Sequence, residues 1–99
     1  MQSSEMMQDG APSEMFEVSY AEAKRFIERH DFTDAVDRLD RARPECEYEL
    51  WLWTDLMAAV LFAQHDYARC HWVLSEYDSR CPGDRRVKCA MTRLKETYL

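Results

Sequence analysis

Three histidines and four cysteines are the residues best suited to chemistry in this sequence of 99 residues. His71 directly follows Cys70, and a histidine beside a cysteine suggests a base that activates a nucleophile. Adjacent residues on a helix point about 100° apart, so these two side chains would not face each other. We therefore expect no Cys–His enzyme.

The same residue types show no metal-binding pattern. The cysteines form no CxxC pair and no CxxC…HxxxH arrangement, and they are Cys46, Cys70, Cys81 and Cys89. His30 and His65 each precede an aspartate where a helix is expected to turn, so we interpret them as residues that end a helix. The acids between Asp31 and Asp40 lack the glycine and terminal glutamate of a calcium loop. We expect no metal, no cofactor and no catalysis.

Composition favours a globular helical chain. Apolar residues make up 46% and charged residues 32%, with only two glycines and three prolines to form turns. The longest apolar run, Leu56–Ala63, is too short to cross a bilayer, so no membrane is expected. No secretory signal is visible, which favours the cytoplasm, or the nucleus in a eukaryote. Cys70 and Cys89 lie on apolar helical stripes and are expected to be buried thiols.

Charge is distributed unevenly along the chain. The net charge is −6, but residues 1–50 carry 13 acids and six bases, whereas residues 80–99 carry six bases and two acids. Non-specific binding to nucleic acid depends on neutralising phosphates. An acidic chain whose basic residues are concentrated in one short segment is therefore not expected to bind nucleic acid.

Apolar spacing predicts five helices after a flexible leader over residues 1–13. Ser13 is the expected cap of the first helix, and Pro44 ends the second because a proline ring does not fit within a continuing helix. The third is apolar nearly all round, so it must be buried on several sides or bind something. The last three helices are expected over about Tyr48–Gln64, Tyr67–Ser79 and, capped by Asp84, up to Tyr98.

An internal repeat appears when the chain is shifted by 35 residues. Ala23 then falls on Ala58, and Ala35 falls on Cys70. The segment 30–32, His-Asp-Phe, falls on His-Asp-Tyr. Two antiparallel helices approach closely only where the side chains at their crossing are small. Each pair of small residues therefore predicts one tight helix hairpin.

This spacing resembles the tetratricopeptide repeat family. The matching positions are Ala23, Phe26, Phe32, Ala35, Leu39 and Ala42, then Ala58, Leu61, Tyr67, Cys70, Leu74 and Pro82. The resemblance implies an all-α fold, with two antiparallel hairpins and a C-terminal capping helix forming an α–α superhelix. The single domain would span 14–99, with repeats at 16–49 and 51–84 and the capping helix at 85–99. Ser19 and Thr54 replace the family's early tryptophan, and a plain helical bundle is the alternative fold.

The resemblance also implies a binding groove lined by the first helix of each repeat. Its residues would be Tyr20, Lys24, Ile27, Leu52, Asp55, Ala59 and Phe62. Such an apolar strip suits the apolar face of a partner helix. In the alternative interpretation, these residues pack on the fifth helix or on a second copy of the chain, which leaves both homo- and hetero-oligomers open.

Three tryptophans support an interaction role, because tryptophan is enriched at interface hot spots. We expect at least one of Trp51, Trp53 and Trp72 to contact a partner. The leading hypothesis is an adaptor, or a subunit of a larger assembly, that binds a helical segment of another protein. The alternatives are a small type III secretion-type chaperone for an export substrate, and the N-terminal segment of a larger scaffold such as an anaphase-promoting complex subunit.

Overall fold

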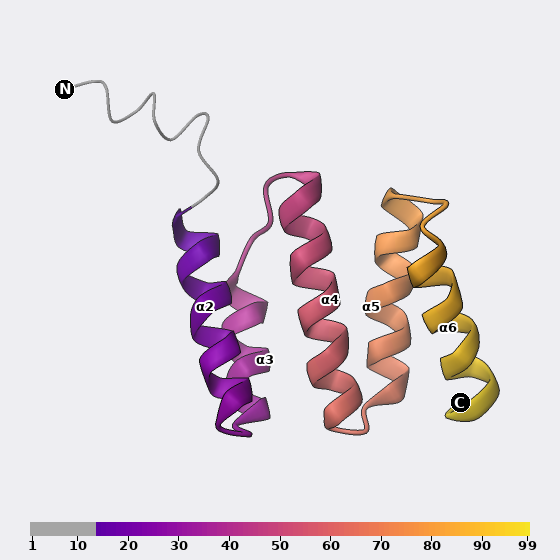
Figure 1. Cartoon of the computed structure of the whole chain (residues 1–99), viewed down its shortest axis with the longest axis horizontal. Coiled ribbons are helices and arrows are strands. Elements are labelled where there is room, and N and C mark those ends of the chain that lie inside the picture. The colour runs from indigo at the N-terminus through magenta and orange to yellow at the C-terminus, as the bar shows by residue number, and fades with distance from the viewer. Residues whose placement is uncertain (1–13) are drawn as a thin grey trace. The chain divides into compact units, whose positions relative to one another are not determined.

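The computed structural model describes residues 14–99, and all the regular structure in that range is helical (Figure 1). The prediction of an all-α chain built of helical hairpins is confirmed. The expected leader and the Ser13 cap lie outside the described residues. The helices are α2 (Glu14–Glu28), α3 (Phe32–Arg41), α4 (Glu47–Ala63), α5 (Tyr67–Arg80) and α6 (Arg85–Thr97).

The chain divides into two compact units. The first ends at Trp53 and contains α2, α3 and the beginning of α4. The second spans Thr54–Leu99 and contains the rest of α4, with α5 and α6.

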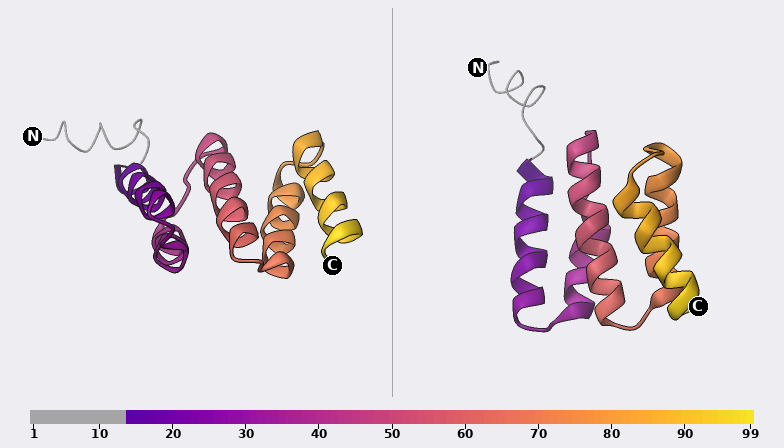
Figure 2. Two further views of the ribbon diagram at one scale, coloured as in Figure 1. Left: turned by 60° about the horizontal axis from the view of Figure 1, so that its bottom comes forward. Right: turned by 45° about the vertical axis from the view of Figure 1, so that its right-hand side comes forward.

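In the first unit, α2 and α3 pack against each other as an antiparallel hairpin (Figure 1; further views in Figure 2). Ala23 and Ala35 are both completely buried, as expected of the small residues at a tight crossing. Phe16 and Leu39 are also almost fully buried and supply the bulk of this small core. Arg38 crosses from α3 to pair with Glu22 of α2 at 3.1 Å.

The turn between α2 and α3 depends on His30, whose φ is +64°. The Asp31 amide donates to the Phe26 carbonyl at 2.8 Å, and the His30 amide donates to the Ile27 carbonyl at 2.9 Å. These two bonds define a Schellman motif, which satisfies carbonyls that the end of a helix leaves without a partner. The interpretation of His30 as a helix-ending residue is confirmed.

The turn between α4 and α5 repeats this geometry 35 residues later. His65 has φ +63°, the Asp66 amide donates to Leu61 at 2.9 Å, and the His65 amide donates to Phe62 at 3.0 Å. The equivalence of the two hairpin turns, inferred from the repeated His-Asp pair, is therefore confirmed.

The beginning of α4 is fixed within the first unit by two polar contacts. The Glu45 amide donates to the carboxylate of Glu49 at 2.9 Å, and the Glu49 side chain is buried against this first turn. Trp53 donates its indole N–H to the Leu39 carbonyl at 2.7 Å and so ties α4 to α3. The segment around Pro44 thus ends one helix and leads directly into the next.

In the second unit, α4 and α5 meet at the predicted pair of small residues. The Cys70 thiol donates to the Ala58 carbonyl at 3.3 Å, a distance that requires close approach of the two helices. Eight larger apolar side chains of this unit are also buried. They are Met57, Val60, Leu61, Val73, Leu74, Tyr77, Val87 and Leu94.

The last helix, α6, begins at Asp84, which accepts the Arg86 amide at 3.0 Å and acts as its cap, as predicted. It buries Val87 and Leu94 and is tied to α5 by Lys88, which pairs with Asp78 at 3.3 Å. The expectation of a buried Cys89 is wrong. Cys89 lies outside the stripe formed by Val87 and Leu94, so the helix turns its thiol towards solvent.

Candidate partner-binding surface

In the first unit, the expected groove residues on α2 form a small mixed patch. The Tyr20 ring stacks on Phe16 with centroids 5.7 Å apart, and the Lys24 ammonium lies 5.5 Å from the centre of the Tyr20 ring. Ile27 is half-buried, as is Leu52 at the beginning of α4. These side chains are therefore largely engaged with their own unit, and only Lys24 is well exposed.

In the second unit, the three expected groove residues on α4 form one exposed stripe. Asp55, Ala59 and Phe62 are four and three residues apart, which places them on one face of the helix. All three are exposed, and Phe62 keeps 41% of its surface open to solvent. The other side chains in this stretch of α4 are buried, apart from the half-buried Leu56, so the stripe is the part of an apolar helix that the unit leaves most open.

Phe62 is also part of an aromatic corner, formed by Phe62, Tyr67 and Tyr98. Phe62 meets Tyr98 edge-on at 5.1 Å and Tyr67 at 5.3 Å, while the two tyrosines stack at 4.4 Å. His65 supports the corner by a 2.6 Å hydrogen bond between its Nδ1 and the Tyr67 hydroxyl. Tyr98 is also 41% exposed. The rings thus hold one another in place while two of them remain accessible.

The beginning of α6 carries a charged pair, Arg86 and Asp84. The hydrogen bond from Arg86 to Asp84 at 2.7 Å lowers the pKa of Asp84, and the same bond is the main reason that the pKa of Arg86 is raised. Asp55 of α4 adds a smaller attraction that also raises the pKa of Arg86. Asp84 therefore holds Arg86 in a position where the negative charge of Asp55 still attracts it.

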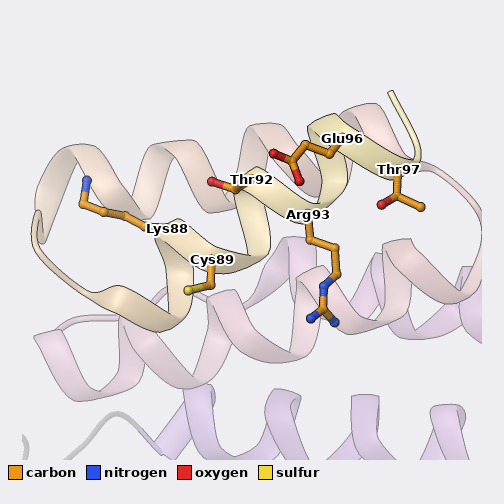
Figure 3. A pocket seen from close by; sticks show the side chains of 6 residues that line it. All are labelled: Lys88, Cys89, Thr92, Arg93, Glu96 and Thr97. Atoms are coloured by element: carbon orange, nitrogen blue, oxygen red, sulfur yellow. The ribbon is translucent and has the colours of Figure 1, made fainter.

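Together these contacts define an α4/α6 face, made of Asp55, Ala59 and Phe62 from α4, Arg86 and Arg93 from α6, and Tyr98 at the C-terminal cap of α6. Arg93 follows Arg86 by seven residues, or about two helical turns, and so shares its side of α6. It is exposed and makes no ion pair within residues 14–99. In Figure 3, Arg93 and Cys89 leave α6 on the side opposite to Lys88 and Glu96.

A shallow depression of about 420 Å³ follows the exposed surface of α6 (Figure 3). It is lined by Lys88, Cys89, Thr92, Arg93, Glu96 and Thr97, whose carbon atoms make most of its surface apolar.

The three tryptophans differ in exposure. Trp72 on α5 is 59% exposed, whereas Trp51 and Trp53 are half-buried. An exposed tryptophan with this much open surface suits an interface anchor. The hypothesis would have failed had all three been buried; it stays a prediction, with Trp72 as the best candidate.

The residues considered for chemistry are dispersed. Burial, with a smaller contribution from the charge of Asp66, raises the pKa of the Cys70 thiol, which disfavours the reactive thiolate. Cys46 is exposed just before α4, and Cys89 is exposed on α6. Across residues 14–99, no three His, Cys, Asp or Glu side chains gather where they could hold a metal ion. None of the helices described is long and apolar enough to span a membrane.

We compared the chain with models of known protein families, with curated proteins and with solved structures. None of these three comparisons finds a match. The resemblance to tetratricopeptide repeats thus depends on the chain's own repeat spacing, and functional inference depends on its surfaces.

Sequence reasoning identified the α4 part of the α4/α6 face but missed the α6 part. Asp55, Ala59 and Phe62 came from the register of the second repeat. Arg93 and Tyr98 lie in the last helix, where no further copy of the repeat exists to align. The one available signal was the excess of basic residues in segment 80–99.

Proposed function

We propose that this protein is a non-catalytic binding module that holds a helical segment of a partner protein, as a subunit of a larger complex. The observation that supports this most directly is the exposed stripe on α4. Met57, Val60 and Leu61 are almost completely buried, yet Ala59 and Phe62 between and beside them are exposed. An apolar helix that leaves such a stripe uncovered offers it to another molecule.

Two further features support the proposal. The two hairpins have equivalent turns, and hairpins of this kind serve in many proteins as scaffolds whose exposed helix faces bind peptides. Trp72 provides a second exposed anchor residue on α5.

Site-specific photo-crosslinking in the native cell tests this function. A photoreactive benzoylphenylalanine at position 59 is expected to crosslink to a defined partner protein, because that position lies on the exposed stripe. The same probe at Lys95, which is also exposed but lies on the opposite side of α6 from Arg86, is the control. Absence of any product at position 59, or the same products at both positions, would contradict the proposal.

A further inference from the structure

We propose that the α4/α6 face of the second unit binds an acidic amphipathic helix of about three turns, supplied by a separate protein. This inference rests on the proposed function and specifies the ligand's charge, polarity and place of binding.

The apolar half of the ligand follows from the aromatic corner and Ala59. Phe62 and Tyr98 present open ring surface, while their mutual contact at 5.1 Å restricts their motion before any ligand arrives. Rings that are already ordered lose little conformational freedom on binding, which favours affinity. Ala59 is small and exposed, so a ligand helix can approach α4 closely beside the rings.

The charge that we infer for the ligand is based on the residues of α6. Arg93 is exposed on this face, and no acid within residues 14–99 neutralises it. Segment 80–99, which contains α6, carries six basic and two acidic residues. Within this segment Lys88 pairs with Asp78, Arg86 pairs with Asp84, and Lys95 lies on the opposite side of α6, so Arg93 is the base that this face offers to a ligand. At physiological salt, charges more than about 8 Å apart are largely screened, so the net charge of the chain acts only weakly on this contact. Glutamate or aspartate beside the apolar stripe of the ligand would therefore pair with Arg93.

The length of the ligand follows from the length of the stripe. Asp55 to Phe62 covers eight residues of α4, a rise of about 10 Å at 1.5 Å per residue, and Tyr98 extends the apolar end. Three helical turns suffice to reach from the charged end of the face to the aromatic corner.

A second copy of this chain is a poorer occupant. Helix α2 exposes Met15 and Val18, but Arg25 lies seven residues after Val18 on the same side of the helix, and Glu22 already pairs with Arg38 at 3.1 Å. The acidic helix α3 offers more negative charge, because Asp34, Asp37 and Asp40 are exposed. Yet every exposed residue of α3 is polar, so this helix has no side chain to fill the aromatic corner, and Asp37 already pairs with Arg41 at 3.2 Å. The charges would match but the apolar surface would remain uncovered.

The test measures binding of synthetic peptides to the full chain by fluorescence anisotropy. Two labelled 14-residue peptides share leucines at helical i, i+3, i+4 and i+7 spacing and carry either glutamates or lysines beside them. We expect the glutamate peptide to bind about tenfold or more tightly than the lysine peptide. Equal or tighter binding of the lysine peptide overturns the inferred charge, and failure of both peptides overturns the inference. The crosslink at position 59 would stand in either case, so the proposed function is judged separately.

Two pairs of variants locate the site. Ala59→Glu and Ala59→Lys add similar bulk at an exposed helical position, so their difference reports charge. Ala59→Glu should weaken the glutamate peptide about tenfold, and Ala59→Lys about threefold or less. Arg93→Glu should weaken it similarly, whereas Lys95→Glu, the same change on the opposite side of α6, should leave it unchanged. Equal effects within either pair contradict the proposed placement.

Circular dichroism of each variant checks that the helices remain folded. Sedimentation of the chain alone addresses self-association. We expect a monomer; a dimer that Ala59→Glu abolishes would mean that a second copy covers this face, which overturns the inference.

Discussion

At the scale of single residues, the buried thiol of Cys70 connects the packing of α4 and α5 to a dependence of stability on pH. Its thiol donates to the Ala58 carbonyl across the α4–α5 crossing, and burial raises its pKa. A group with a raised pKa in the folded state stabilises that state fully below the pKa of the unfolded chain, which for cysteine is about 8.5. Above that pH the unfolded thiol ionises first, so this contribution falls as the pH rises through the folded pKa.

We therefore predict that Cys70→Ala flattens the loss of stability between about pH 8 and 10. Ala35 occupies the equivalent position of the first hairpin, so alanine fits this kind of crossing, and the cost at pH 7 should be about 1 kcal/mol. Urea unfolding at several pH values measures both effects. Cys46→Ala, at an exposed thiol, is the control. A pH dependence identical to that of the unaltered protein would contradict this account of Cys70.

At the scale of elements, the hairpin turns depend on a backbone conformation that histidine adopts at a cost. A left-handed conformation is unfavourable by about 1–2 kcal/mol for residues other than glycine, and worse for β-branched ones. His30 and His65 both adopt it, and each also contacts the aromatic residue that opens the next helix.

His30→Val is accordingly expected to lower the free energy of unfolding by about 1–2 kcal/mol, because valine resists positive φ. His30→Gly should be neutral or stabilising, since glycine has no such cost. Thermal unfolding of the two variants compares them directly. Were glycine to destabilise as much as valine, the ring contact with Phe32, rather than the backbone, would determine the strength of this turn.

The helices and turns also show which parts of the fold and of the candidate site could be predicted from the sequence. Prolines, aspartate caps and the 35-residue repeat are local or internally duplicated signals, so the helices and both small-residue crossings were predictable. The last helix had no such duplicate, and its apolar pattern alone did not determine which side would be buried. Cys89 was therefore placed wrongly, and packing of Phe62 on the last helix, where it meets Tyr98, was foreseen only as the alternative interpretation. Contacts between residues far apart in sequence depend on tertiary packing, which periodicity within one helix does not determine.

At the scale of the whole molecule, the acidic net charge repels an acidic ligand, whereas the basic last segment attracts it. The chain carries −6 overall, while residues 80–99 carry six bases and two acids. In about 0.01 M salt the screening length is 30 Å, so the ligand is repelled by the entire chain; at about 0.1 M it is 10 Å and local charges dominate. The two scales of charge can therefore be separated by salt.

We predict that the association rate of the glutamate peptide rises by about twofold or more between 0.01 and 0.1 M salt, because long-range repulsion is screened first. Towards 1 M salt the affinity should fall, because the contact with Arg93 is then screened as well. Stopped-flow fluorescence measures both the rise in association rate and the fall in affinity. Arg93→Glu should abolish the fall in affinity at high salt while preserving the rise in rate at low salt. A rate that falls steadily from the lowest salt upward would mean that the basic segment already attracts the ligand from afar, and that the acidic remainder of the chain has no influence on the encounter.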